Sequence, residues 1–147
     1  MTRFSTYVAP PWVRFGFVAI WGLVLLYASV SDPSGAGLSR TGPFGVLGLD
    51  KWLHAAGYAA FAVLVAYAFL PRWRGTRRGL IASLLLAGGY GLAMEVVQGP
   101  LAYRSFDPAD AVANLFGALV VVLAVGLGSR VLERRSRRSR PEPGRGR

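Results

Sequence analysis

Residues 109–127 read ADAVANLFGALVVVLAVGL, and no charged residue follows Asp110 in this stretch. A helix that crosses the hydrocarbon core of a bilayer needs about 20 mostly apolar residues. Polar and apolar residues do not alternate here, which argues against a β-strand. The stretch therefore predicts a membrane-spanning helix.

Three further stretches have the same character, at residues 12–30, 53–70 and 79–98. Helix breakers agree with these limits because proline and glycine interrupt regular structure. They are Pro10-Pro11 before the first stretch, Pro71 after the second, Gly99-Pro100 after the third and Asp107-Pro108 before the fourth. We predict an all-α polytopic membrane protein in which residues 1–129 form one four-helix bundle.

The two ends of the chain need separate interpretations. Residues 130–147 are mainly Arg, Ser, Pro and Gly, which predicts a disordered, Arg-rich tail. The first apolar stretch could instead belong to a signal peptide, but Ala28-Ser29-Val30 is a poor cleavage site. We therefore expect an uncleaved first helix, and cleavage would leave three spans.

The composition of the 147-residue chain excludes several classes of protein. There is no cysteine, which excludes disulfides, thiolate metal sites and a cysteine nucleophile. The net charge of +10 could suit nucleic acid, but the basic tail has no interleaved aromatic residues and no nucleic-acid-binding module is present. We expect membrane lipid, and not nucleic acid, as the partner of the basic residues.

The positive charge predicts an orientation. The N-terminal segment carries +2, the 71–79 loop +4 and the tail +6, whereas the residues on the other side of the four spans sum to −2. Lys and Arg in short loops favour the cytoplasm. Both termini should therefore be cytoplasmic in a multi-pass protein of the cell membrane, with the loops at 31–52 and 99–108 outside.

The remaining polar residues gather at three helix ends near the predicted outer interface. Apart from Lys51 and the loop residue Arg104, the spacing places these residues on one face of each predicted helix. They are Asp50, Lys51, His54 and Tyr58 on the second helix, Glu95 and Gln98 on the third, and Arg104, Asp107, Asp110 and Asn114 from the last loop into the fourth. Ionisable groups within spans are costly and usually face the bundle interior or a wet cavity. We expect these residues to form a polar site, in which Lys51 or Arg104 pairs with Glu95. The alternative is an ion-pair network that only stabilises the bundle.

These residues resemble the VanZ-like membrane proteins. The resemblance rests on Asp50-Lys51-x-x-His54-x-x-x-Tyr58, Glu95-x-x-Gln98 and Arg104-x-x-Asp107-x-x-Asp110-x-x-x-Asn114-x-x-Gly117, in this order on three spans. It implies a polytopic envelope protein, linked through the family's name to resistance against the glycopeptide teicoplanin, and it assigns no reaction. Family members often carry a second glycine four residues after the one matching Gly117, where this chain has Val121. That departure puts close helix packing there in question.

Three kinds of function suit the predicted site. In a binding protein, Lys51 and Arg104 would contact an anionic lipid or a cell-wall precursor, because guanidinium groups bind phosphate well. In an intramembrane enzyme, His54 and Glu95 would act as acid and base beside Asp110. A single histidine with two carboxylates is a weak metal signature, so we expect no metal and no cofactor. The third kind is a transporter or a structural partner of another membrane protein, and the sequence predicts no oligomeric state.

Overall fold

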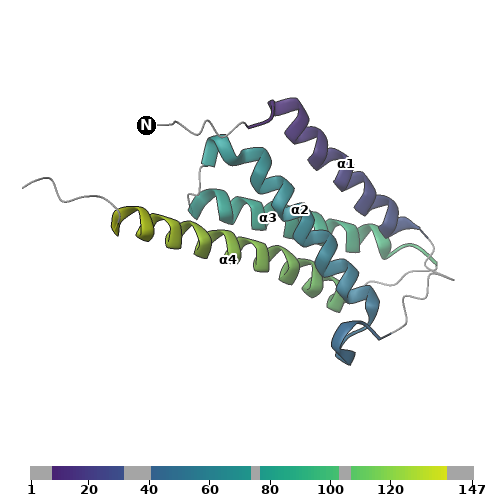
Figure 1. Cartoon of the computed structure of the whole chain (residues 1–147). Helices are drawn as coiled ribbons and strands as arrows, with labels where there is room; N and C mark the ends of the chain where they lie inside the picture. The colour runs from purple at the N-terminus through teal and green to yellow at the C-terminus, as the bar shows by residue number, and fades with distance from the viewer. Residues whose placement is uncertain (1–7, 32–40, 74–76, 103–106, 139–147) are drawn as a thin grey trace, which may run out of the picture.

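The structure is a computed structural model that describes residues 8–31, 41–73, 77–102 and 107–138. Its elements are α1 (Pro11–Val30), the short 3₁₀ helix η1 (Pro43–Gly45), α2 (Leu49–Trp73), α3 (Arg77–Gln98) and α4 (Pro108–Arg138). Successive α-helices run in alternating directions (Figure 1). The prediction of an all-α four-helix bundle is confirmed.

All four helices are long and apolar enough to cross a membrane. The qualifying segments are Pro11–Val30, Leu49–Phe69, Arg78–Gln98 and Pro108–Gly128. Large apolar side chains are exposed along the whole bundle, among them Leu23, Leu85 and Leu127. Such extensive apolar exposure suits a lipid environment and not water. The chain is therefore a multi-pass membrane protein.

Two helix limits lie where the sequence predicts them. Helix α4 begins at Pro108, and the backbone N–H of Ala109 donates to Oδ1 of Asp107 at 2.8 Å. This hydrogen bond is a helix N-cap, which satisfies one of the free N–H groups of the first turn. Helix α3 ends at Gln98, directly before Gly99-Pro100.

The prediction that Pro71 ends the second helix is wrong, because α2 continues to Trp73. Proline has no N–H to donate to the carbonyl four residues earlier, here that of Tyr67. In membranes, groups from neighbouring helices commonly support the backbone at such a place. Here buried Arg14 of α1 donates from Nη1 to the adjacent carbonyl, that of Ala68, at 2.7 Å. This contact gives a physical reason for the continuation.

The predicted boundary of the tail is also wrong, because α4 extends through residues 130–138. Arg, Leu and Glu in this segment are good helix formers. Positive charge near a helix C-terminus also interacts favourably with the helix dipole. The rest of the predicted tail, 139–147, lies outside the described residues.

The bundle is held by close contacts among α2, α3 and α4. Its buried apolar cluster is Tyr58, Phe61, Ala62, Val65, Ala87 and Ala118. A Cβ atom added to Gly117 of α4 would overlap the backbone carbonyl of Ala55 in α2. The two helices therefore touch backbone to backbone at this glycine. Val121 packs against the core cluster one turn later, so it does not prevent the close approach.

Near the middle of α1, two hydrogen bonds to backbone carbonyls join this helix to α2 and α3. Nε1 of Trp21 donates to the carbonyl of Gly57 at 3.0 Å, and the hydroxyl of Tyr90 donates to the carbonyl of Gly22 at 2.6 Å. These hydrogen bonds fix α1 against α2 and α3. As a result, the last turns of α1 lie beside the first turns of α2.

Candidate functional site

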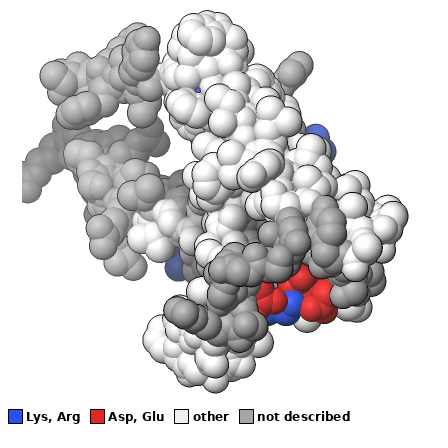
Figure 2. Space-filling model, turned by 90° about the vertical axis from the view of Figure 1, so that its right-hand side faces the viewer, with Lys and Arg blue, Asp and Glu red and all other residues white. Residues whose placement is uncertain are grey.

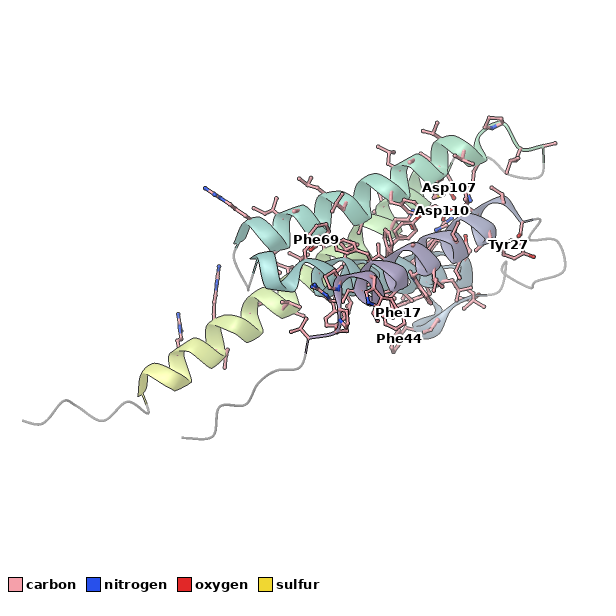
Figure 3. All side chains as sticks on the ribbon, turned by 90° about the horizontal axis from the view of Figure 1, so that it is seen from above. Phe17, Tyr27, Phe44, Phe69, Asp107 and Asp110 are labelled. Carbon is pink, nitrogen blue, oxygen red and sulfur yellow. The ribbon has the colours of Figure 1, made fainter. Side chains whose placement is uncertain are left out.

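The polar residues meet at one end of the bundle, where α1 and α3 end and α2 and α4 begin; we call it the polar end. Asp107 and Asp110 lie toward the end at which Tyr27 is found, away from Phe69 (Figure 3). Figure 2 shows acidic atoms gathered around a basic group, and the other coloured atoms of the described surface in this view are basic and stand apart from one another. The predicted convergence of helix ends therefore takes place on α2 and α4.

Lys51 is the centre of an ion-pair cluster. Its Nζ lies 2.8 Å from Oδ2 of Asp50, 2.6 Å from Oδ2 of Asp107 and 2.5 Å from Oδ1 of Asp110. An ammonium group has three N–H donors, and here each has a carboxylate partner. The Lys51 cluster, defined by these four residues, therefore carries an excess of negative charge. Lys51 does not pair with Glu95, contrary to the prediction, because these aspartates are closer to it.

Asp107 caps α4 and lies just outside the spanning segment Pro108–Gly128. The Lys51 ammonium and, after it, the N–H of Ala109 hold the pKa of the Asp107 carboxyl below its ordinary value. A carboxyl whose pKa is lowered by folding stabilises the protein above its ordinary pKa. That contribution is lost as the pH falls through the lowered pKa.

We expect this linkage to show in the variant Asp107→Asn. Asparagine is as good an N-cap as aspartate, so the substitution removes the charge and keeps the cap. Wild type should be the more stable protein from neutral pH down to about pH 4, and the difference should shrink below that pH. Thermal unfolding of the two detergent-solubilised proteins at a series of pH values measures this difference in stability. A difference that persists unchanged to about pH 2 would contradict the assignment.

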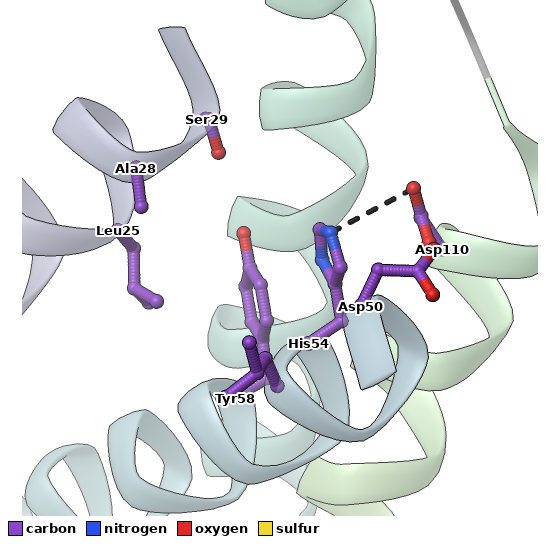
Figure 4. A pocket seen from close by; sticks show the side chains of 8 residues that line it. Leu25, Ala28, Ser29, Asp50, His54, Tyr58 and Asp110 are labelled. Carbon is purple, nitrogen blue, oxygen red and sulfur yellow. Dashed lines mark ion pairs between the residues drawn. The ribbon is translucent and has the colours of Figure 1, made fainter. Parts of the chain in front are cut away.

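A cavity of about 170 Å³ opens beside the Lys51 cluster. Its walls come from α1, α2 and α4, and they are Leu25, Ala28, Ser29, Asp50, Leu53, His54, Tyr58 and Asp110. Figure 4 shows the Tyr58 ring and the His54 imidazole side by side on α2, with Ser29 of α1 across from them. Most of the polar side chains that line the cavity are therefore carboxylates or groups that can donate and accept a proton.

Two side chains of α4 orient His54. Its Nδ1 lies 3.0 Å from Oδ1 of Asn114. Its Nε2 lies 3.6 Å from Oδ2 of Asp110, the ion pair drawn as a dashed line in Figure 4. Both ring nitrogens therefore face oxygen atoms. The arrangement holds the imidazole plane in one orientation at the edge of the cavity.

Several buried polar atoms near the cavity have no partner in the described part of the chain. They are both carboxylate oxygens of Glu95, the hydroxyl of Tyr58 and Nδ2 of Asn114. These side chains are at most 2% exposed. Buried polar groups in proteins are nearly always hydrogen-bonded to protein or to water, so such atoms call for a partner.

These atoms belong to one place in the bundle. A Cβ atom added to Gly91 of α3 would lie 3.0 Å from Cε1 of Tyr58 and 3.0 Å from Cβ of Asn114. Glu95 follows one turn later on α3, within electrostatic range of His54 and Asp110. We use the name polar chamber for the polar wall of the cavity (Ser29, Asp50, His54, Tyr58, Asp110) together with Glu95 and Asn114.

Of the two remaining predicted site residues, the structure describes Gln98 and does not describe Arg104. Gln98 is buried, and its Nε2 donates to the carbonyl of Ser29 at 3.1 Å, so it connects α3 to α1. Arg104 lies outside the described residues. Nothing in the structure therefore bears on the predicted pairing of Arg104 with Glu95.

Sequence reasoning missed Ser29. It is buried and lines the cavity from α1, a helix to which we assigned no site residue. One signal was available, since Ser29 is the only serine or threonine between residues 12 and 30. Small polar residues in spanning helices often face other helices.

The chamber suits hydrogen bonding and proton transfer. Among the described residues, no group of three or more His, Asp or Glu side chains is placed to hold a metal ion.

Comparison of the chain with protein-family models, with curated proteins and with solved structures found no match.

Proposed function

We propose that this chain is a VanZ-like integral membrane protein of the cell envelope whose polar chamber binds a lipid or a cell-wall-related ligand. One observation carries the proposal: Tyr58, Glu95 and Asn114 are buried beside a cavity with polar atoms that have no partner in the described chain. The Lys51 cluster, in which every Lys51 donor has a carboxylate partner, fits an ion-pair network that stabilises the bundle. The chamber atoms need a partner from water or from a ligand, and the proposal assigns them a ligand.

The charge distribution supports an outward-facing polar end. The predicted cytoplasmic segments hold the positive charge, and the polar end lies on the opposite side of the four helices. The chamber would then open toward the outer leaflet. A lipid headgroup or a lipid-linked cell-wall precursor would reach it from there.

The described charges favour a ligand group that donates hydrogen bonds. Asp50 and Asp110 line the cavity, while Lys51 already has three carboxylate partners. Hydroxyl, amide or ammonium groups of a ligand suit this lining. If the ligand also carries an anionic group, its contact in this proposal is Arg104, the second cation of the predicted site.

Native mass spectrometry of protein extracted from membranes tests the proposal. Tyr58→Phe and Glu95→Gln each change one unpartnered group and keep the shape of the side chain. Each should weaken ligand binding by about 3- to 10-fold, as expected for one lost hydrogen bond. Ser83→Ala is the matched control, because Ser83 is equally buried but donates to the carbonyl of Gly79 in its own helix. Equal occupancy in wild type and all three variants would contradict the proposal.

The second candidate is an intramembrane enzyme that acts on a lipid or envelope substrate. The observation that favours it is the His54 imidazole, oriented by Asp110 and Asn114 at the cavity edge with Glu95 in electrostatic range. A histidine held in this way is a suitable general acid or base. A modified lipid formed by wild type from envelope lipid extract, and lost in His54→Gln while binding remains, would support catalysis.

A further inference from the structure

A second hollow lies on the other side of the Lys51 cluster. It is an almost wholly apolar groove of about 530 Å³ between α2 and α4. Trp52 and Ala55 form one side, and Pro108, Val112, Ala113 and Phe116 form the other. Val112 and Phe116 are largely exposed, so the groove opens on the surface that faces lipid. Its volume is within the range of sites that hold small molecules.

The Lys51 cluster forms the wall between the groove and the chamber. Lys51 lines the groove, Asp110 lines the cavity, and their side chains are in contact. A molecule in the groove therefore has its nearest charged groups at this cluster. An amphipathic ligand could place an apolar chain in the groove and its headgroup at the cluster.

A compact turn extends the apolar surface at the polar end. We call residues 41–48 the apolar turn. The N–H of Gly42 donates to the carbonyl of Leu47 at 2.7 Å, and Thr41 and Gly48 form an isolated antiparallel β-bridge. Phe44 is 87% exposed and has a left-handed φ of 65°, which is unfavourable for an aromatic residue. Its ring lies 5.9 Å from that of Trp52, and Leu47 lines the groove. Backbone strain of this kind persists only where the surroundings impose it.

The turn contains no charged residue. Exposed apolar side chains at the end of a spanning helix suit the boundary between headgroups and acyl chains, where aromatic residues are enriched. The turn would therefore lie in the leaflet beside the groove. An acyl chain that enters the groove from this leaflet would contact Leu47 and Trp52 first.

The charges of the Lys51 cluster select the headgroup. All three Lys51 donors are used by carboxylates, so no Lys51 donor remains for a phosphate. Asp50 and Asp107 have side chains 34% and 39% exposed. Each carboxylate oxygen has two lone pairs and can accept a further hydrogen bond, and the excess negative charge of the cluster favours a cation. An ammonium group meets both requirements.

We propose that the groove between α2 and α4 holds an acyl chain of an amine-bearing phospholipid whose ammonium group contacts Asp50 and Asp107. This inference deepens the proposed function, on which it rests, by naming the class of ligand and its route of entry from the surrounding leaflet. The structure has the three parts that such a ligand needs, in order: apolar groove, acidic rim and hydrogen-bonding chamber.

Photolabelling in nanodiscs tests the groove. The probes are phosphatidylethanolamine and phosphatidylglycerol, each carrying the same diazirine in one acyl chain, in nanodiscs of equal parts of the two lipids. We expect phosphatidylethanolamine to label residues 108–116 about tenfold more than phosphatidylglycerol, as expected for a charge-assisted hydrogen bond. Equal labelling by the two probes would overturn the proposal.

Variants that fill the groove with a larger side chain provide the second part of the photolabelling experiment. Ala113→Phe fills the groove and should lower labelling about tenfold, because it keeps several methylene groups of the chain out. Val112→Phe lies at a more exposed position and should also lower labelling of the groove. It replaces Ala113→Phe in the test if that variant does not fold. Val120→Phe is the control, since Val120 is exposed on α4 but does not line the groove.

The two proposals fail in different ways. If Tyr58→Phe and Glu95→Gln reduce ligand occupancy while Ala113→Phe and Val112→Phe leave labelling unchanged, the chamber proposal stands and the groove proposal is wrong. If the groove variants abolish selective labelling while the chamber variants leave ligand occupancy unchanged, the groove binds lipid and the chamber proposal is wrong. Loss in both sets, with the controls unaffected, supports a single ligand that occupies groove and chamber.

Discussion

Gly117→Ala should lower the free energy of unfolding of the bundle by about 3 kcal/mol, at the upper end of the cost of overpacking a core. The added Cβ atom would overlap the backbone carbonyl of Ala55, and the nearby backbone carbon atoms of Ala55 are also too close. Because backbone cannot rotate away as a side chain can, α2 and α4 must separate. Thermal unfolding in detergent, followed by circular dichroism, measures the loss.

Gly128→Ala is the control on the same helix. A Cβ atom at Gly128 meets nothing within 4 Å, so the substitution tests the general effect of replacing glycine in a helix. Alanine is favoured over glycine in helices by about 0.5–1 kcal/mol, and Gly128→Ala should therefore be neutral or slightly stabilising. If both variants unfolded at the same temperature, the contact between α2 and α4 would be looser than described.

Lys51→Met should also have a large effect at neutral pH, about 3 kcal/mol, because it leaves three carboxylates together without their cation. Methionine keeps much of the length and apolar area of the side chain, so the loss reports mainly on charge. Lys51→Arg keeps the charge but not the compact ammonium geometry, and should cost less. Thermal unfolding of the three proteins at neutral pH compares them.

Acidic pH provides an internal check on this prediction. Carboxylates lose their charge in acid, so the repulsion that Lys51→Met leaves uncompensated disappears there, and the difference in unfolding temperature between wild type and Lys51→Met should narrow as the pH falls. A Lys51→Met variant as stable as wild type at neutral pH would show that the ion pairs do not hold α2 and α4 together.

Much of the candidate site could be predicted because helical spacing is regular. Once four spans are recognised, Asp50, His54 and Tyr58 must share a face of α2, and Asp107, Asp110 and Asn114 must share a face of α4. The alternating direction of the helices then places these faces at one end of the bundle. The structure brings them together as expected, around Lys51 and the cavity.

The choice of partners could not be predicted in the same way. Lys51 lies on α2 and could have reached Glu95 on α3 or the aspartates near the start of α4. Which carboxylate it meets depends on the rotation and crossing of the helices, and these follow from the contact at Gly117 rather than from spacing along one helix. Ser29 lines the site for a similar reason, because Trp21 joins α1 to α2 and Tyr90 joins it to α3.

The sequence by itself determined the membrane class, the all-α fold and the end of the bundle at which polar groups gather, because hydropathy and helical period are local properties of the chain. Tertiary structure decided the rest. Contact with Arg14 of α1 accompanies the continuation of α2 beyond Pro71. Packing across the bundle also pairs Lys51 with three aspartates and leaves the Glu95 carboxylate without a partner among the described residues. It also separated an apolar groove from a polar chamber by a single ion-pair cluster. These features depend on which surfaces of different helices meet, and that is set by packing across the bundle.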